Sequence, residues 1–244
     1  MTHDRLSESG RLDLPGWLEP VREASARIRP EQLSGFLPPP DASPSKSAVL
    51  MLFADGDRGP ELLLTERSHT MRSHPGQVSF PGGRMDPGED AVSAALREAW
   101  EETGVDPSGV LPFGHLPELW LPPSNHAVTP ILGYTERPES LYVASPAEVH
   151  AIHRVPIAEL RDPAHRITVR HRLGFMTPGF WIGDGKDVIL WGFTAGIIAR
   201  LFEFLGWIQD MPDAPATALP DYMYPENDPR RTAAAGPIDD EVAE

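Results

Sequence analysis

The most constraining feature of this chain is the run G-R-M-D-P-G-E-D-A-V-S-A-A-L-R-E-A-W-E-E-T-G-V at residues 83–105. Because a Pro-Gly turn at 87–88 lies near its start, we expect a helix to begin near Glu89 or Asp90 and to end at Gly104. Small and apolar residues recur at helical spacing and predict one buried stripe, formed by Val92, Ala95, Leu96, Ala99 and Thr103. The run therefore predicts an amphipathic helix packed on a core.

Three carboxylates, Glu98, Glu101 and Glu102, gather on another arc of this helix. At about 100° per residue, Glu98 and Glu102 lie roughly 40° apart and are expected to turn away from the buried stripe. Like charges four residues apart destabilise a helix by a few tenths of a kcal/mol, and a bound divalent cation would reverse the sign of that effect. The alternative is an ordinary solvated acidic face. No lysine follows the glutamates to pair with them, which favours a metal site.

The same run resembles the Nudix box, the Gly/Glu/Arg-Glu/Glu-Glu/Gly signature of hydrolases that split nucleoside diphosphates joined to another group. The matching positions are Gly83, Glu89, Arg97, Glu98, Glu101, Glu102 and Gly104, followed by apolar Val105. On this interpretation Glu98 and Glu102 bind Mg²⁺ or Mn²⁺, and Glu101 does so directly or through water. We expect Arg97 to pair with Glu89 and hold the helix and the preceding loop in register.

A second motif, L-L-T-E-R-S-H-T-M-R-S-H-P-G-Q-V-S-F-P-G-G at 63–83, resembles the additional signature of the coenzyme A pyrophosphatase branch of Nudix hydrolases. Arg67 and Arg72 are the arginines of this motif, and guanidinium groups suit phosphate oxygens. From position alone, two surface arginines paired with carboxylates are the alternative. Gly82 and Gly83 would let the backbone turn tightly and approach the substrate.

One segment departs from the pattern of this branch. The branch commonly has Ser-Gly and an aromatic residue before a Val-Thr-Pro strand, whereas this chain has Ser-Asn-His-Ala at 124–127. The roles of Asn125 and His126, and the preference for an acyl chain, therefore stay open.

The pattern of the rest of the chain predicts one domain with two extensions. Residues 1–45 combine an amphipathic helix with a Pro-rich linker and are expected to form an N-terminal helical arm. Apolar runs at 46–210 predict short strands around the acidic helix and a closing helix near 190–208. This arrangement indicates an α/β fold, an α/β/α sandwich around a mixed sheet, which is also the fold that the Nudix resemblance implies. The tail at 211–244, poor in large apolar residues, is expected to be disordered and acidic.

Composition narrows the functional classes. Lys and Arg total 21 against 36 Asp and Glu, a net charge of −15, which argues against nucleic acid or an anionic membrane as a partner. The absence of cysteine excludes disulfides, thiolate zinc sites and cysteine nucleophiles. The N-terminus carries charges and no apolar segment of a secretory signal, so we expect a cytoplasmic protein.

These observations predict a metal-dependent Nudix diphosphatase that splits coenzyme A or acyl-CoA into 4′-phosphopantetheine and adenosine 3′,5′-bisphosphate. A small-molecule diphosphate is the expected partner. The alternatives are a Nudix hydrolase of ADP-ribose, NADH or nucleoside triphosphates, and a non-catalytic nucleotide sensor. The general base, the attacked phosphorus, the choice between Mg²⁺ and Mn²⁺ and the formation of a homodimer stay open.

Overall fold

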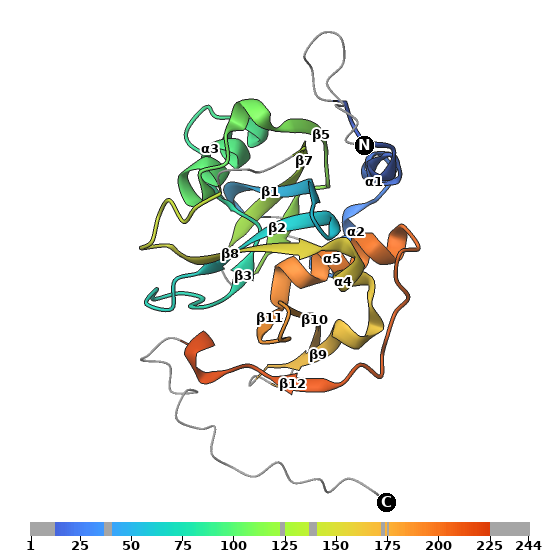
Figure 1. Ribbon diagram of the computed structural model, residues 1–244. Coiled ribbons are helices and arrows are strands. Elements are labelled where there is room, and N and C mark those ends of the chain that lie inside the picture. The colour runs from blue at the N-terminus through green and yellow to red at the C-terminus, as the bar shows by residue number, and fades with distance from the viewer. Residues whose placement is uncertain are drawn as a thin grey trace, which may run out of the picture.

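A mixed sheet forms the centre of the computed structural model, which describes residues 13–36, 41–122, 125–136, 141–171, 174 and 176–224 (Figure 1). Its strands are β1 (Ser45–Gly56), β2 (Gly59–Arg67), β3 (Val78–Ser79), β4 (Gly82–Arg84), β5 (Leu111–His115), β6 (Leu119–Leu121), β7 (His126–Thr135) and β8 (Val149–Pro156). The order is β3-β2-β1-β7-β5, with β4 paired to β1, β6 to β7 and β8 to β2. Strands β1 and β7 run parallel, and the other pairs are antiparallel.

Helices cover both faces of this sheet. They are η1 (Gly16–Leu18), α1 (Glu19–Ser25), α2 (Pro30–Leu33), α3 (Ala91–Thr103), η2 (Pro107–Gly109), α4 (Ile157–Arg161), η3 (Pro163–His165), α5 (Gly192–Phe204) and η4 (Asp221–Met223). In β1, Leu50 and Leu52 pack in the core under α3, whereas Met51 and Phe53 pack in the larger core with α5. Because β1 is buried on both faces, its sequence is a continuous apolar run. The predicted α/β/α sandwich is confirmed.

The ends of α3 lie where the sequence places them. The Asp90 carboxylate accepts hydrogen bonds of 3.0 Å from the backbone N–H groups of Val92 and Ser93. These bonds satisfy two N–H groups that have no partner within the helix. At the other end Gly104 has a φ of 69°, the left-handed conformation that ends many helices.

The described part of the N-terminal arm packs on the domain. Leu18, Val21 and Ala24, from η1 and α1, are fully buried in the core that also holds Met51 and Phe53. The apolar face of this helix is therefore part of the main core.

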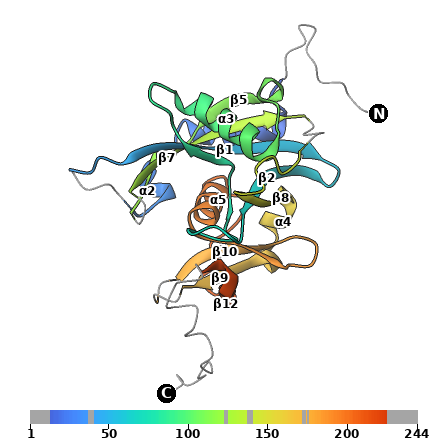
Figure 2. The ribbon, with the colours of Figure 1, turned by 90° about the vertical axis from the view of Figure 1, so that its left-hand side faces the viewer.

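A second sheet, which the sequence did not predict, lies beyond α5. Its strands are β9 (Arg166–Arg170), β10 (Met176–Ile182), β11 (Val188–Leu190) and β12 (Ala216–Ala218), in the order β11-β10-β9-β12. Figure 2 shows the layers in sequence: α3, the central sheet, α5 and the second sheet. Helix α5 is buried because it packs against both sheets, and no helix in the described ranges is long and apolar enough to cross a membrane.

The prediction of a disordered tail at 211–244 is wrong for residues 211–224. Residues 211–224 contribute β12, which runs parallel to β9, and η4. Leu219, Met223 and Tyr224 are at most 5% exposed and share a core with Ile167 and Val169. The apolar residues here are few, but the second sheet offers them a surface that the sequence does not reveal. The remainder of the predicted tail, 225–244, lies outside the described residues.

We expect a chain that ends at Asp210 to lose a few kcal/mol of unfolding free energy. It would lose β12 and the burial of side chains such as Leu219 and Met223, each worth about 1.5–3 kcal/mol. A chain that ends after Tyr224 is the control and should unfold like the full chain. Equal midpoints in urea for all three proteins would contradict this packing.

Candidate active site

The glutamates of α3 lie against the strand β4 that precedes the helix. The Gly82 N–H donates a hydrogen bond of 3.3 Å to Glu102 Oε2. Glu102 is only 7% exposed, whereas the side chain of Glu98 is 17% exposed and that of Glu101 is 49% exposed. The three carboxylates thus run from the interior to the surface along the last turns of α3.

Two details of the predicted stripe are wrong. Val92 is exposed, and Ala94 is buried in its place. Glu102 does not turn away from the buried face but forms part of it, beside Thr103. The reason is tertiary, because the last turn of α3 packs against glycines of β4 that leave room for a carboxylate.

Gly82 and Gly83 are sites of close approach between β4 and its neighbours within the protein, and their approach to the substrate stays a prediction. A Cβ on Gly83 would lie 2.5 Å from the Glu98 carboxyl carbon, and a Cβ on Gly82 would lie 2.4 Å from the backbone oxygen of Ala48. Gly82, which has a φ of 155° and lies against backbone atoms, requires glycine for steric reasons, whereas a Cβ at Gly83 would displace the Glu98 carboxylate. The backbone of β4 can consequently lie directly against the acidic face of α3.

Arg97 joins the helix to the loop before it. Its Nε and Nη2 donate hydrogen bonds of 2.9 Å to the two carboxylate oxygens of Glu89, and Nη2 also donates to the backbone oxygen of Arg84 at 3.1 Å. This is the pair that the sequence predicts. Arg97 Nη1 also reaches Glu98 at 2.9 Å and Glu101 at 3.5 Å. The bonds to Glu89 and the other carboxylates raise the pKa of Arg97, and its guanidinium balances part of the cluster's charge.

Burial makes Glu98 and Glu102 hard to ionise. Burial raises the pKa of Glu102 to about 8, and the charges of Glu98 and Glu148 add to the rise. The pKa of Glu98 is raised as well, first by burial and further by the charges of Glu101 and Glu148. A buried carboxylate with one long hydrogen bond is ionised readily only when a positive charge lies beside it.

Glu148, which no sequence pattern assigns to the site, lies near enough for its charge to act on Glu98 and Glu102. It is exposed and lies directly before β8, whose pairing with β2 brings it to the cluster. Its backbone oxygen accepts a hydrogen bond of 2.7 Å from the Ser68 N–H. No local pattern marks Glu148, because it comes near α3 only through long-range contacts: the pairing of β8 with β2 and the backbone hydrogen bond from Ala144 N–H to Glu102.

The two predicted phosphate-binding arginines differ in position. Arg67 ends β2, is half-buried, and its charge lowers the pKa of Glu102, so it lies on the side of the acidic cluster. Its Nε is buried without a hydrogen-bond partner within the described ranges. Arg72 is exposed in the loop between β2 and β3 and makes no hydrogen bond or ion pair with the described residues. The structure therefore brings Arg67, but not Arg72, to the carboxylates.

The residues that depart from the branch signature have structural contacts. Asn125 Oδ1 accepts a hydrogen bond of 3.1 Å from Trp120 Nε1, and His126 Nδ1 lies 2.8 Å from Ser47 Oγ. Ser124 lies outside the described residues. Asn125 and His126 thus connect β7 to its neighbours.

Comparison with known proteins decides the family. A model of the NUDIX domain matches residues 44–173, more than half of the chain. The chain belongs to the Nudix hydrolase family. The Nudix box and the glutamates of α3 lie inside the matched range.

The chain is similar to several proteins with Nudix names. Nudix hydrolase 3 of Caenorhabditis elegans is 44% identical over 118 residues, which are 48% of this chain and 49% of that protein. The chain thus spans about half the length of that relative. The uncharacterized Nudix hydrolase NudL of Enterobacter sp. (strain 638) is 40% identical over 152 residues, or 60% of this chain and 76% of that protein. A MutT/nudix family protein from Enterococcus faecalis is 18% identical with a TM-score of 0.45, covering 83% of this chain and 78% of that one.

The acidic cluster of α3 has the donor atoms that a divalent cation needs. Its donors are carboxylate oxygens, the ligands that Mg²⁺ and Mn²⁺ prefer. Buried Glu102 and half-buried Glu98 carry raised pKa values that a nearby cation would lower.

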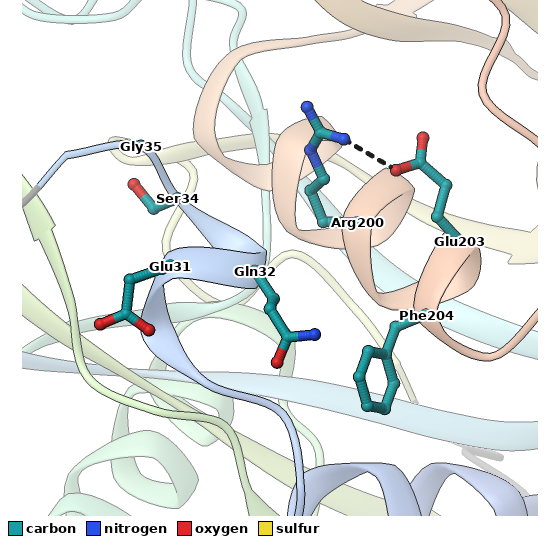
Figure 3. A pocket seen from close by; sticks show the side chains of 7 residues that line it. All are labelled: Glu31, Gln32, Ser34, Gly35, Arg200, Glu203 and Phe204. Carbon is teal, nitrogen blue, oxygen red and sulfur yellow. Dashed lines mark hydrogen bonds and ion pairs between the residues drawn. The ribbon is translucent and has the colours of Figure 1, made fainter.

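A separate pocket of about 480 Å³ lies between α2 and α5 (Figure 3). Its lining includes Glu31, Gln32, Phe204 and an ion pair of 3.0 Å between Arg200 and Glu203. None of the predicted Nudix site residues lines it. The chemistry of this protein is therefore expected at α3 and β4, away from this pocket.

Proposed function

We propose that the chain is a metal-dependent pyrophosphohydrolase that cleaves the diphosphate of coenzyme A or acyl-CoA, giving 4′-phosphopantetheine and adenosine 3′,5′-bisphosphate. The observation that carries the hydrolytic part is the burial of Glu102 beside Glu98, with Arg67 nearby as a cation. This combination of carboxylates for a metal and a guanidinium for phosphate suits a diphosphate, whose negative charge the acidic chain would otherwise repel.

Each residue has a proposed role in the reaction. Glu98 and Glu102 would hold Mg²⁺ or Mn²⁺, and Glu101 would bind directly or through water. When bound, such a cation neutralises diphosphate charge and makes water more acidic. Arg97 holds Glu89 and Glu98 in place, and Arg67, whose charge acts on Glu102, would bind phosphate oxygens through its guanidinium group.

We assign the role of general base to Glu148. Glu98 and Glu101 are paired with Arg97, and Glu102 is buried. Glu148 is exposed, and its side chain makes no ion pair with the described residues. A carboxylate that is free to move and lies beside the cluster suits proton transfer from the attacking water.

The choice of coenzyme A rests on the motif at 63–83. Arg67 and Arg72 lie on the strand and loop that it covers, and coenzyme A carries a ribose 3′-phosphate besides its diphosphate. Arg72, which is exposed and has no partner among the described residues, is available for that extra phosphate. ADP-ribose and NADH carry no phosphate besides their diphosphate for a second arginine to bind, and a non-catalytic sensor would not require the full set of glutamates.

The direct test is a substrate panel. Purified full-length protein with Mg²⁺ or Mn²⁺ is incubated with coenzyme A, acyl-CoAs, ADP-ribose, NADH and nucleoside triphosphates, and the products are identified by mass. We expect 4′-phosphopantetheine from coenzyme A at the highest kcat/KM. Faster cleavage of ADP-ribose or NADH would overturn the coenzyme A assignment, and no cleavage of any substrate would favour the sensor.

We expect Arg72→Ala to raise the KM for coenzyme A by roughly tenfold to a hundredfold. A charge-assisted hydrogen bond is worth about 1.5–3 kcal/mol, and about 1.4 kcal/mol is a factor of ten. If Arg72 binds the 3′-phosphate, the KM for 3′-dephospho-coenzyme A should hardly change. Arg27→Ala removes an exposed arginine at the end of α1 and is the matched control. Identical KM values for coenzyme A in Arg72→Ala and Arg27→Ala would exclude Arg72 from the substrate site.

A further inference from the structure

A cluster of histidines surrounds a buried carboxylate at the end of β2, outside the acidic cluster of α3. Ligand atoms of Glu66, His69 and His150 all lie within 4.8 Å of one another. Glu66 belongs to β2, His69 to the loop that follows, and His150 to β8. No sequence motif assigns a role to any of these three residues.

The pairing of β2 with β8 brings His150 to this cluster. In the antiparallel pair of β2 and β8, Glu66 lies opposite Ala151 and Arg67 opposite Val149. His150 is the extra residue between them, so the strand has a bulge there. Bulges redirect side chains, and this one turns an imidazole toward the neighbouring strand.

Hydrogen bonds hold the carboxylate at the centre. Glu66 Oε1 lies 2.6 Å from His69 Nε2, and Glu66 Oε2 lies 3.0 Å from His153 Nε2. The ring of His69 stacks between His150, at 4.2 Å, and Tyr222 of the C-terminal segment, at 4.7 Å. The Glu66 side chain is 7% exposed, whereas that of His69 is 36% exposed. A cation can therefore enter from solvent through the imidazoles and reach a buried oxygen.

The cluster is separate from the acidic site. Leu62 and Leu64 lie in the core on the α5 side, and residues two apart on a strand share a face, so Glu66 belongs to that side. Arg67, the next residue, acts on Glu102 on the α3 side. The two clusters thus lie on opposite faces of the central sheet.

We propose that Glu66, His69 and His150 form a second metal site, which takes a borderline divalent cation of the Zn²⁺ class. Two imidazole nitrogens and one carboxylate oxygen are a donor set that Zn²⁺ prefers, whereas Mg²⁺ prefers oxygen alone. Zn–N bonds of about 2.0–2.1 Å require the ligand atoms to approach one another. Rotation of the two exposed imidazoles supplies this approach. His153 holds the second oxygen of Glu66 and orients the carboxylate.

The site has a consequence for the loop between β2 and β3. A metal here joins the start of that loop, at His69, to β8, while Tyr222 closes over the same ring and packs on Gly76. The loop carries Arg72, so the cation would order an arginine that otherwise has no partner among the described residues. The site itself does not depend on the hydrolytic function.

The test is a calorimetric titration of full-length protein with Zn²⁺ in excess Mg²⁺, which occupies oxygen-only sites. We expect one Zn²⁺ per chain in the wild type. His150→Gln should weaken Zn²⁺ binding about a hundredfold. It should leave the fold intact, because His150 is exposed and takes no part in the Glu66 hydrogen bonds. His115→Gln, at an exposed histidine of β5, is the matched control and should bind like the wild type.

A second variant separates the two clusters. Glu98→Gln combined with Glu102→Gln removes the two less exposed carboxylates of the acidic cluster and should keep the Zn²⁺ site. Titration with Co²⁺ should give a visible absorption band in this double variant that disappears when His150→Gln is added. Wild-type protein without Zn²⁺ binding would overturn the proposal. So would binding that survives His150→Gln, or binding that is lost with the two glutamates alone.

Discussion

Replacing Glu102 with Gln is expected to lower kcat by about a thousandfold or more and to leave the fold intact. The variant keeps the size of a side chain that is 7% exposed but removes the charge that a metal needs. Metal ions contribute several kcal/mol of charge stabilisation in such reactions, and about 4 kcal/mol corresponds to a thousandfold in rate. Initial rates at saturating Mg²⁺ or Mn²⁺, on the best substrate of the panel, measure the effect.

Glu23→Gln is the matched control, because Glu23 is an exposed glutamate of α1. It should retain the kcat of the wild type. A folded Glu102→Gln protein with a near-normal kcat would show that Glu102 is not a metal ligand and would leave Glu98 and Glu101 as the candidates.

The second expectation concerns the stability of the metal-free protein. The pKa of Glu102 rises from 4.5 to about 8 because the carboxyl group is buried. Between these values the native protein holds a proton on Glu102 that the unfolded chain releases, so stability falls as pH rises. The contribution of Glu102 to the free energy of unfolding is fully present below about pH 4.5, and it is lost as the pH rises to about 8. One unit of pKa corresponds to about 1.36 kcal/mol, so we expect a loss on the order of 4 kcal/mol from this group.

Glu102→Gln should cancel this loss, because a neutral amide has no proton to release. With EDTA present, the variant and the wild type should have similar free energies of unfolding near pH 4.5. Near pH 9 the variant should be more stable by a few kcal/mol, measured by urea denaturation. Saturating Mg²⁺ should narrow the difference, since a cation stabilises the ionised native carboxylate. A difference that does not change with pH would contradict the raised pKa.

These two expectations together describe a conflict between stability and function at one residue. The same burial that makes Glu102 costly without a cation makes it a strong partner for one. A variant that gains stability and loses turnover is the expected signature of a site of this kind.

Much of the acidic site was predictable because its parts are close in sequence. The limits of α3 follow from Asp90 and Gly104, and the pair of Arg97 with Glu89 joins residues eight positions apart. In each case helix geometry or turn chemistry acts over a few residues, and the sequence displays it directly.

The remaining features depend on which surfaces meet. The burial of Glu102 depends on β4, the position of Glu148 on the pairing of β8 with β2, and the packing of Leu219 on a second sheet. Hydrophobic periodicity predicts that one face of an element is buried, but it does not indicate which other element packs against that face. For this reason the sequence indicated a free acidic tail where the structure has β12.

The sequence by itself determined the helix α3, its carboxylates, the arginine that braces them and the α/β character of the domain. Only the tertiary structure decided which carboxylate is buried and which histidines meet at Glu66. Glu66 and His150 are 84 positions apart, and a bulge in a strand pair brings them together. The physical reason is that local propensity acts along the chain, whereas burial and pKa depend on neighbours that only long-range strand pairing supplies.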